Sequence, residues 1–402
     1  MSKQNLTLRW GILATGGIAQ SFAKDLTVDP KTRNVTNLTH VVEAAASSSS
    51  KSRAEQFLKD VDAPSSARAY GSYEELVKDP NVDIIYVATP HSHHYQNTML
   101  CLNAGKHVLC EKAFTTNAAQ AKLLVNKAQE RGLFLMEAVW TRYFPISAYV
   151  RELITSGKLG ALTRVSAAND KAGDPYNKHA DGKHRMVNMD LAGGALLDLG
   201  IYSLTWLFQT LYLTQPEGKR ARPSVVGSSM KKFPTGADTD TTILMKFPNG
   251  GGDEGDAQGI ATTSMIVDSD VDGKGTSGPA VRIQGEKGEV QVWPPIYRPT
   301  KTRLILADGT CEDKQWPQPG PGKGSGWYNG FGGDMQPEGE GQGMFWEADE
   351  CGFALMEGRK EGRLEGWEES VLIMEVMDEV REQNGMKYPK EVESVEYPLK
   401  MK

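Results

Sequence analysis

The apolar positions divide the chain into two halves with different patterns. In the first 150 residues, short apolar runs alternate with segments whose apolar residues have helical spacing. The expected strands lie at 8–14, 40–46, 82–89, 107–113 and 133–139, and the expected helices at 18–26, 52–60, 73–78, 93–103 and 117–131. Strands that alternate with helices of this length form βαβ units, whose strands run parallel. Residues 1–150 are therefore predicted to form an α/β domain that binds its ligand at the carboxyl ends of the strands.

After about residue 150 the pattern changes to strands with few helices between them. Alternating or continuous apolar runs predict strands at 163–169, 241–247, 261–267, 280–285 and 290–293. Residues 151–402 are therefore expected to form an α+β domain around an open, mostly antiparallel sheet. Residues 368–383 have helical spacing, and we expect this closing helix to return to the first domain. Two glycine-rich stretches, 249–259 and 320–343, are interpreted as long surface loops.

Composition and charge argue against several classes of function. The chain has 402 residues and a formal net charge of −6, and no run rich in lysine or arginine stands out, which argues against nucleic-acid binding. Residues 1–9 are polar, so we expect neither a signal peptide nor a membrane anchor there and predict a cytoplasmic protein. The four cysteines are sparse and lack C-x-x-C spacing, as is typical of reduced thiols.

A glycine-rich turn joins the first expected strand to the first expected helix. The sequence Ala14-Thr15-Gly16-Gly17-Ile18-Ala19 is a G-x-G-x-x-A dinucleotide fingerprint in which alanine replaces the first glycine. Small residues there let backbone N–H groups approach a pyrophosphate at the helix N-terminus. The alternative is a glycine-rich turn without a ligand, but its place between strand and helix favours a dinucleotide site.

The end of the second expected strand indicates which dinucleotide binds. A site for NAD normally has an aspartate or glutamate here that accepts hydrogen bonds from the ribose. This sequence instead has four serines, 47–50, followed by Lys51 and Arg53. Hydroxyl groups and cations suit a 2′-phosphate, so the sequence predicts NADP, with Ser48, Ser49 and Arg53 as its phosphate contacts. The same serines can cap the following helix, and the two interpretations are compatible.

Two further motifs carry candidate catalytic side chains. Glu111 and Lys112 lie at the carboxyl end of a parallel strand, where α/β sheets bind ligands. Asp198 and Tyr202 are spaced i and i+4, which places both on one face of a helix. A lysine at a strand end can be a plain surface cation, and a buried Asp/Tyr pair can be purely structural. Together, Lys112, Asp198 and Tyr202 form a candidate acid/base set beside a nicotinamide.

Three histidines follow the third expected strand. His91, His93 and His94 are close enough in sequence to suggest zinc binding, but no cysteine or carboxylate completes a metal set nearby. We therefore predict no metal. The segment that begins at Thr89 and Pro90 is instead expected to cover the nicotinamide ribose.

In their order along the chain, these motifs resemble the glucose-fructose oxidoreductase/inositol dehydrogenase family, often called Gfo/Idh/MocA. The resemblance rests on GILATGGIA, VDIIYVATPHSHH, AGKHVLCEKAF, FLMEAVWTRYFP and GGALLDLGIY. Within the family, the last two motifs are most similar to the branch of dimeric dihydrodiol dehydrogenases and fungal NADP-dependent D-xylose 1-dehydrogenases. Ala113 departs from the family, which usually has proline after the Glu-Lys pair.

The resemblance implies that Lys112 and Tyr202 are the catalytic pair and that the protein is a homodimer. It implies hydride transfer to NADP from the anomeric carbon of an aldopyranose such as D-xylose, which gives the aldonolactone. We predict that Tyr202 accepts the hydroxyl proton, that Lys112 lowers the pKa of Tyr202 and that Asp198 orients the substrate. His184 is the next candidate base. The alternatives are a trans-1,2-dihydrodiol dehydrogenase and, in another class, a non-catalytic NADP-sensing regulator.

Sugar sites combine hydrogen-bonding groups with aromatic surfaces, because sugars have polar edges and apolar faces. The residues expected to contact the substrate are therefore Lys112, Trp140, Arg142, Asn169, Asp170, His184, Arg185, Asp198 and Tyr202. The residues expected to contact NADP are Ala14, Thr15, Gly16, Gly17, Ile18, Ser47, Ser48, Ser49, Arg53, Thr89, Pro90, His91, His94, Glu111, Lys112, Trp140 and Arg142. The alternative for the aromatic residues is an interdomain core.

Overall fold

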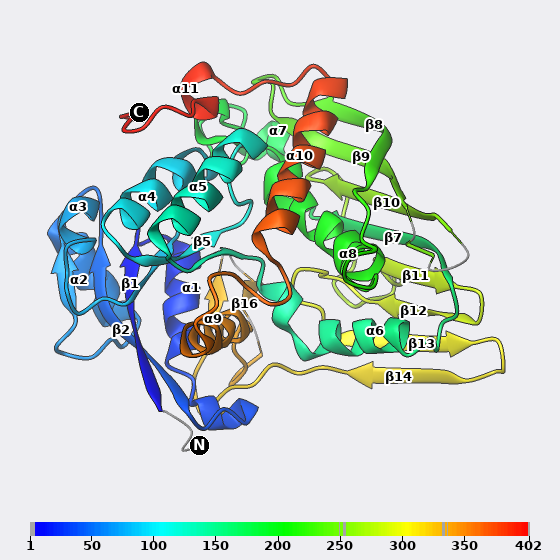
Figure 1. Ribbon diagram of the computed structural model, residues 1–402, viewed down its shortest axis with the longest axis horizontal. Coiled ribbons are helices and arrows are strands. Elements are labelled where there is room, and N and C mark those ends of the chain that lie inside the picture. The colour runs from blue at the N-terminus through cyan, green and yellow to red at the C-terminus, as the bar shows by residue number, and fades with distance from the viewer. Residues whose placement is uncertain (1–4, 249, 252–254, 332–333, 336, 401–402) are drawn as a thin grey trace.

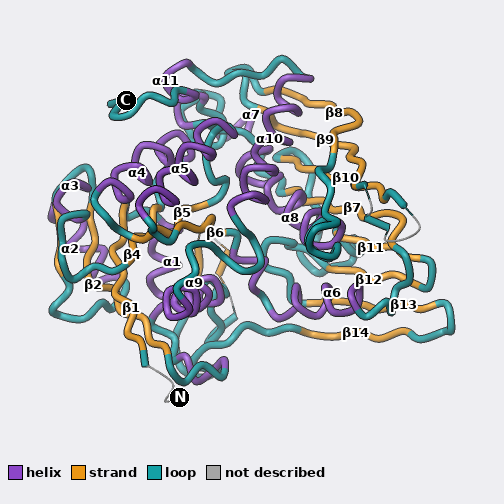
Figure 2. Tube along the Cα trace, in the orientation of Figure 1, coloured by secondary structure: helices purple, strands orange, loops and turns teal. Residues whose placement is uncertain are grey.

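The computed structural model describes residues 5–248, 250–251, 255–331, 334–335 and 337–400. Figure 1 shows two sheets side by side, with helices packed against both of them. Figure 2 shows the strands of the second sheet together along one side of the molecule. The two patterns in the sequence therefore correspond to two separate sheets.

The first sheet has six parallel strands. They are β1 (Leu6–Leu13), β2 (Leu38–Ala46), β3 (Arg68–Tyr70), β4 (Ile84–Val87), β5 (His107–Glu111) and β6 (Leu135–Ala138), in the order β3-β2-β1-β4-β5-β6. The strand order reverses between β1 and β4, and open α/β sheets bind their ligands at such a point. The prediction of a parallel α/β domain is confirmed. The glycine-rich turn follows β1, and Lys112 follows β5.

Helices connect these strands as the spacing predicts. They are α1 (Gly17–Leu26), α2 (Lys51–Asp60), α3 (Tyr73–Leu76), α4 (His91–Asn103) and α5 (Ala118–Arg131). Ser50, Ser72 and Asn117 cap α2, α3 and α5, each accepting a hydrogen bond from the backbone N–H three residues on. Such a cap satisfies a donor that has no partner inside the helix. A 3₁₀ turn, η1 (Pro30–Arg33), lies in the connection between α1 and β2.

The second sheet has eight strands and is mostly antiparallel. They are β7 (Leu162–Asp170), β8 (Ser224–Lys232), β9 (Asp238–Phe247), β10 (Ala257–Ser264), β11 (Val281–Gly285), β12 (Gly288–Val292), β13 (Lys301–Leu306) and β14 (Cys311–Gln315), in the order β14-β13-β12-β11-β7-β10-β9-β8. Among the described strands of this second sheet, only the β7/β10 pair is parallel. Five of these strands were predicted. The strands β8, β13 and β14 were missed, and β14 has no apolar alternation because all its residues are exposed.

Short helical segments link the two sheets and cover the second one. They are η2 (Trp140–Tyr143), α6 (Pro145–Thr155), α7 (Pro175–Lys178), η3 (Met189–Leu191), η4 (Leu196–Gly200) and α8 (Ile201–Leu211). Every residue of α8 is buried, and the helix packs against β7 and β10. The segment Met189–Leu211 is long and apolar enough to span a membrane by composition, but 89% of its most apolar window is buried in this fold. It is therefore a core segment of the second domain.

The end of the chain returns to the first sheet. Helix α9 (Phe345–Glu357) packs against α1, β1 and β2, and α10 (Trp367–Gln383) packs against α5 and β8, followed by α11 (Lys390–Glu393). The expected contact of the closing helix with the first domain is thus present. Helix α9 was not predicted, because its buried face includes Glu347 and Asp349, which break the apolar pattern of an amphipathic helix.

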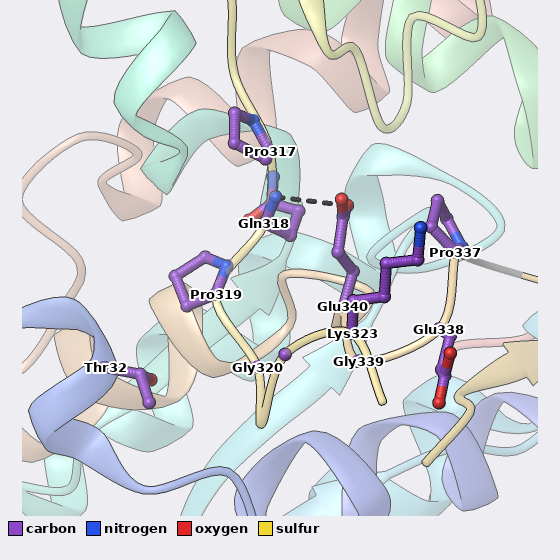
Figure 3. A pocket seen from close by; sticks show the side chains of 11 residues that line it. Thr32, Pro317, Gln318, Pro319, Gly320, Lys323, Pro337, Glu338, Gly339 and Glu340 are labelled. Carbon is purple, nitrogen blue, oxygen red and sulfur yellow. Dashed lines mark hydrogen bonds between the residues drawn. The ribbon is translucent and has the colours of Figure 1, made fainter. Parts of the chain in front are cut away.

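The two glycine-rich stretches have different structures. Gly259 belongs to β10, where a Cβ would lie 2.7 Å from the Phe247 ring; residues 249 and 252–254 are outside the described residues. In the stretch 320–343, which includes β15 (Gly330–Phe331) and β16 (Asp334–Met335), Gly339 crosses close to the backbone of Gly322. Figure 3 shows a surface pocket between the arms of this loop, lined by residues such as Pro319 and Glu340. None of the residues predicted to bind cofactor or substrate lines it.

Candidate active site

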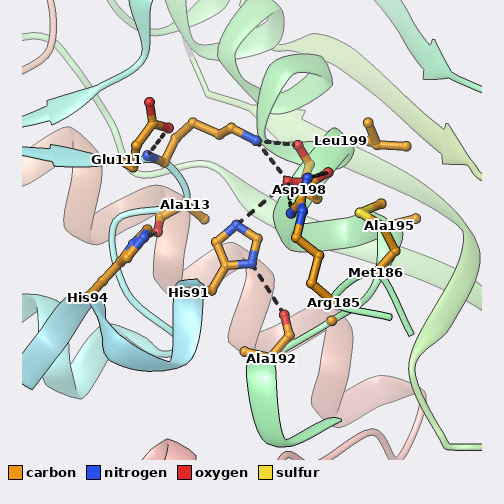
Figure 4. Close-up of polar contacts among 12 residues, drawn as sticks. His91, His94, Glu111, Ala113, Arg185, Met186, Ala192, Ala195, Asp198 and Leu199 are labelled. Carbon is orange, nitrogen blue, oxygen red and sulfur yellow. Dashed lines mark hydrogen bonds and ion pairs between the residues drawn. The ribbon is translucent and has the colours of Figure 1, made fainter. Parts of the chain in front are cut away.

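The Lys112 side chain crosses from the first sheet to the second domain. Its Nζ donates to the backbone oxygen of Asp198 at 2.8 Å and to Asp198 Oδ1 at 3.0 Å. Arg185 Nη1 approaches the same oxygen at 3.1 Å, and His91 Nε2 lies 3.8 Å from it (Figure 4). The structure therefore brings together four of the residues predicted from separate motifs.

Asp198 lies in η4, a turn with π-helical geometry that leads into α8. Such a turn is wider than an α-helical one and is frequent at functional sites. Burial would raise the pKa of Asp198, but the charges of Arg185 and Lys112 outweigh it and hold the pKa well below its ordinary value. Asp198 therefore stays ionised and fixes the position of the Lys112 ammonium.

Tyr202 lies near this cluster, on α8. The Lys112 Nζ is 5.1 Å from the centroid of the Tyr202 ring, and Trp140 Nε1 donates to the Tyr202 hydroxyl at 2.8 Å. Burial raises the pKa of Tyr202 well above its ordinary value, and the charge of Glu111 adds to this rise. Burial therefore outweighs the lowering expected from Lys112, whose ammonium is bonded to Asp198, and the net pKa of Tyr202 is raised. Tyr202 is a neutral phenol at neutral pH.

The rings of Trp140, Tyr202 and Tyr297 lie together and form a surface that we call the aromatic wall. The rings of Trp140 and Tyr297 are nearly parallel, at 10°, with centroids 6.2 Å apart, and the rings of Tyr297 and Tyr202 are 5.7 Å apart. Sequence reasoning found Trp140 but missed Tyr297, which follows the cis Pro294–Pro295 bond in an irregular loop. No local pattern marks such a residue, because only the packing of the loop brings it to Trp140.

Glu111 contacts the backbone of Lys112. The carboxyl group is 6% exposed, accepts the Lys112 backbone N–H at 3.1 Å and accepts a hydrogen bond from the Tyr86 hydroxyl. These contacts place Glu111 in a positioning role rather than against NADP. The peptide bond from Lys112 to Ala113 is cis.

The histidines tie neighbouring segments together. His94 is 1% exposed, and its ring nitrogens each lie 2.9 Å from a backbone oxygen, one of Thr89 and one of Ala113. His91 Nδ1 lies 3.3 Å from the Ala192 oxygen, so this ring bridges the first domain to the second. In the described part of the chain, no group of three or more His, Cys, Asp or Glu side chains is arranged to hold a metal ion.

The glycine-rich turn has open access to the N-terminus of α1. Gly16 and Gly17 are exposed, and no side chain caps α1, so its first N–H groups are free of side-chain acceptors. Ala14 has a positive φ of 86°, the conformation for which glycine is favoured. Thr15 and Ile18 are half-buried beside this turn. This geometry suits a pyrophosphate.

The end of β2 also has the predicted character. Ser48, Ser49 and Arg53 are exposed, whereas Ser47 is buried and its hydroxyl lies 2.9 Å from that of Ser49. Ser50 accepts the Arg53 backbone N–H at 3.3 Å and thus serves as the helix cap. The cap and the exposed serines coexist, as the sequence suggested.

Arg142 does not join the site. Its side chain is fully buried, pairs with Glu369 and donates to the Leu364 oxygen at 3.3 Å. The prediction that Arg142 contacts cofactor or substrate is wrong. Arg142 and Trp140 are two residues apart on a 3₁₀ turn, which has three residues per turn, so their side chains diverge.

Three other predicted substrate residues make contacts elsewhere. Asn169 is 4% exposed and donates to the Leu199 oxygen at 3.0 Å, so it holds the η4 turn. Asp170 Oδ2 accepts from the Ser269 hydroxyl at 3.3 Å, and burial raises the pKa of Asp170 to about 6. His184 is exposed and stacks on His179, with centroids 3.8 Å apart. The role of these residues at the substrate stays a prediction.

Comparison with known proteins finds relatives along most of the chain. Residues 8–139 match a family described as an oxidoreductase family with an NAD-binding Rossmann fold, and residues 147–291 match the GFO/IDH/MocA C-terminal domain. The chain is 52% identical to D-xylose 1-dehydrogenase (NADP(+)) of Hypocrea jecorina over 95% of this chain and 93% of that protein. It is 35% identical to trans-1,2-dihydrobenzene-1,2-diol dehydrogenase of Bos taurus over 96% of this chain and 99% of that protein.

Solved structures share the fold at lower sequence identity. KijD10, a 3-ketoreductase from Actinomadura kijaniata crystallised with NADP, is 21% identical with a TM-score of 0.69, over 94% of this chain and 98% of that one. An aldose-aldose oxidoreductase from Caulobacter crescentus is also 21% identical, with a TM-score of 0.70, over 94% of this chain and 97% of that one. The family predicted from the motifs is confirmed: the chain belongs to the Gfo/Idh/MocA family of oxidoreductases.

Proposed function

We propose that this protein is an NADP-dependent D-xylose 1-dehydrogenase. The observation that carries the proposal is the 52% identity, over 95% of the chain, to an enzyme of that activity. The reaction removes a hydride from the anomeric carbon and a proton from the hydroxyl on that carbon, so that the aldopyranose becomes its lactone. The contacts of Lys112 with Asp198 and with the Tyr202 ring support the proposal.

The residues at the first sheet fit NADP. The open N-terminus of α1 suits the pyrophosphate, and the exposed Ser48, Ser49 and Arg53 at the end of β2 suit a 2′-phosphate. When bound, NADP supplies the acceptor for the hydride. Lys112 would stand beside the nicotinamide, since it follows β5 at the ligand-binding edge of the sheet.

The protein's own side chains must accept the proton of the substrate hydroxyl. Trp140 Nε1 donates to the Tyr202 oxygen, and this oxygen, once deprotonated, can accept the proton of the substrate hydroxyl. Because burial raises the pKa of Tyr202, this deprotonated form is scarce at neutral pH and becomes more abundant as pH rises. Lys112, held by Asp198, provides positive charge near the developing alkoxide.

A substrate panel tests the proposed reaction. D-xylose, its deoxy analogues, D-glucose and a benzene dihydrodiol are supplied with NADP, and the absorbance of the reduced nicotinamide is followed. Xylose should exceed the deoxy analogues by a wide margin, since unpaired buried polar groups discriminate strongly, and glucose should lose less. Efficient turnover of the dihydrodiol with negligible turnover of aldoses would instead support the second candidate.

That second candidate is trans-1,2-dihydrodiol dehydrogenation. It is favoured by the aromatic wall of Trp140, Tyr202 and Tyr297, which suits an apolar ring, and by the 35% identity to enzymes of that name. A non-catalytic NADP-sensing regulator would bind NADP and turn over nothing in the panel.

A single substitution tests the cofactor assignment. Ser49→Asp places a carboxylate beside the expected 2′-phosphate, so it should raise the KM for NADP and improve the relative use of NAD. Ser66→Asp is the matched control, because it adds the same charge at an exposed serine that precedes β3, whereas Ser49 follows β2. An unchanged NADP/NAD ratio in Ser49→Asp would contradict the assignment.

We further propose that the protein is a homodimer formed through the open face of the second sheet. Val226 of β8 and Leu244 of β9 are 62% and 40% exposed on neighbouring strands. Light scattering tests this proposal, and a monomer mass would contradict it. A cytoplasmic location and the lack of nucleic-acid and membrane partners stay predictions.

A further inference from the structure

A fully buried carboxylate lies against the turn that carries Asp198. Asp238 is the first residue of β9, and its Oδ2 accepts from the Leu196 backbone N–H at 2.8 Å and from the Thr241 hydroxyl at 2.9 Å. Leu196 begins the η4 turn, where the first N–H groups have no partner inside the turn. Ala195, at the N-cap position, has no side-chain acceptor. Asp238 therefore supplies, from another strand, the cap that the local sequence lacks.

The two glycines before the turn make room for this contact. Gly194 has a positive φ of 137°, and a Cβ there would overlap Asp238 Oδ1. At Gly193, a Cβ would lie 2.9 Å from the Asn188 nitrogen. The Gly-Gly pair of the GGALLDLGIY motif is thus explained by the close approach of Asp238 and of the preceding loop.

The contact has a direct consequence for Lys112. Asp198 is two residues beyond Leu196 in the same short turn, and both its backbone oxygen and its Oδ1 accept from Lys112 Nζ. A shift of the turn therefore moves both acceptors together. Asn169 bonds the other end of the turn through the Leu199 oxygen, so the turn is held from both ends.

We infer that Asp238 is a positioning residue of the proposed dehydrogenase. It holds the start of the η4 turn so that Asp198 keeps the Lys112 ammonium in place, and it acts through Asp198 without touching substrate or cofactor. The inference rests on the proposed function and adds to it a residue remote in sequence from the motifs of the site.

Three substitutions separate hydrogen-bond acceptance from charge and bulk. Asp238→Asn keeps an oxygen for the Leu196 N–H and should retain most of the kcat for xylose. Asp238→Ala removes the acceptor, and Asp238→Glu pushes a longer side chain against Gly194. Both should lower kcat by about 10- to 100-fold, because displacements of about 1 Å at a catalytic group cost that much. The dissociation constant of NADPH, measured by its fluorescence, should not change.

A neighbouring carboxylate on the same strand provides the matched control. Asp240 Oδ1 accepts from the Ser264 hydroxyl at 2.5 Å, and Asp240 is two residues from Asp238 on β9. Asp240→Ala should therefore keep the kcat of the unmodified protein, in contrast to Asp238→Ala. A general loss of stability in β9 would affect both positions, whereas the positioning role predicts a loss of kcat only at Asp238.

A second readout needs no turnover. An amine-reactive reagent acylates Lys112, and mass spectrometry measures the rate of labelling. This rate reports whether Asp198 holds the ammonium. Labelling should be several-fold faster in Asp238→Ala and Asp238→Glu than in the unmodified protein and in Asp238→Asn. If the unmodified protein oxidises no aldose, the proposed function fails, but the labelling still tests Asp238.

Two results would overturn the inference. One is a kcat within about twofold of the unmodified protein, with unchanged labelling, in Asp238→Glu and Asp238→Ala. The other is an equal loss in Asp238→Asn, since that would make the charge and not the acceptor oxygen decisive. If Asp238→Ala does not fold, the comparison of Asp238→Glu with Asp238→Asn decides the question.

Discussion

Two buried charge clusters in this protein have opposite compositions. In the site cluster, Lys112 and Arg185 share the single carboxylate of Asp198. In the second cluster, which we call the Arg142 cluster, the guanidinium of Arg142 pairs with Glu369 and lies 3.9 Å from Glu365, and the charge of Arg142 also acts on Glu137. The direct ion pairs around Asp198 thus join two cations to one acid, whereas the acids around Arg142 outnumber the cation.

The difference shows how a fold handles unbalanced buried charge. Excess cation at Asp198 holds its pKa well below the ordinary value, and Arg185 keeps 45% of its side chain in water. In the Arg142 cluster, water does not solvate the excess acid, because the side chains of Arg142 and Glu365 are completely buried. Burial therefore raises the pKa of Glu365 and Glu137 above the ordinary value, so that protons in place of cations neutralise the excess. In the site cluster, Asp198 therefore stays ionised, whereas in the Arg142 cluster burial favours the protonated, uncharged form of Glu365 and Glu137.

Loss of Lys112 should have the largest effect on the site cluster. Lys112→Met removes the charge beside the reacting hydroxyl but leaves Asp198 paired with Arg185, so the fold should persist. Loss of a positioned acid/base group typically lowers kcat by about 100- to 10,000-fold. Steady-state kinetics with xylose and NADP measure the change, and Lys122→Met, at an exposed lysine, is the control. Near-normal kcat in Lys112→Met would remove Lys112 from the mechanism.

Loss of Arg142 should have the largest effect on stability. Arg142→Met leaves the buried Glu369 without its cation, and breaking a buried pair in this way costs about 3–5 kcal/mol. Urea unfolding measures the free energy, with Arg363→Met as the control because the Arg363 side chain is 62% exposed. Adding Glu369→Gln to Arg142→Met should recover part of the loss. A loss below about 1 kcal/mol in the single variant would mean that the cluster is not held by Arg142.

Glu137 should make stability depend on pH. Burial raises its pKa in the folded state above the ordinary value of 4.5, against the effect of its hydrogen bonds to Ser370 and the Phe114 N–H. The folded state then binds a proton that the unfolded state releases, so this contribution is full below about pH 4.5 and is lost as pH rises through the raised pKa. The slope reaches at most about 1.4 kcal/mol per pH unit.

Urea unfolding of the unmodified protein and of Glu137→Gln at roughly pH 5 to 8 measures this contribution as a difference. The amide cannot ionise, so the free energy of unfolding of Glu137→Gln should fall less steeply as pH rises. Glu130→Gln, at an exposed residue, is the control. Parallel curves for Glu137→Gln and the unmodified protein would show that Glu137 does not titrate in this range.

Arg185 should show the smallest effect. Its side chain is 45% exposed, and Asp198 keeps Lys112 as a partner when Arg185 is lost. Arg185→Met should therefore lower the free energy of unfolding by less than about 1 kcal/mol, as for partly exposed pairs in general. The same urea measurement compares it directly with Arg142→Met. Equal losses in the two variants would erase the distinction between the clusters.

The sequence alone determined the elements and the ends of strands on which the site lies. The spacing of apolar residues and the position where a strand ends are set by residues near each other in the chain. Local patterns therefore reveal the fingerprint turn after β1, the serines after β2 and Lys112 after β5. Parallel strands then bring these ends to one edge of the sheet, so their convergence could be predicted without the structure.

The tertiary structure decided what each charged or aromatic group contacts. Sequence reasoning placed Arg142 at the substrate, but Glu369, 227 residues away, holds it in the core. It missed Tyr297 and Asp238, whose partners Trp140 and Leu196 lie on other elements. It also did not weigh burial and the charge of Glu111, which raise the pKa of Tyr202 and arise only from the packing of the two domains. The pKa and the burial of a side chain depend on all its neighbours in space, and the local pattern of the sequence does not reveal those neighbours.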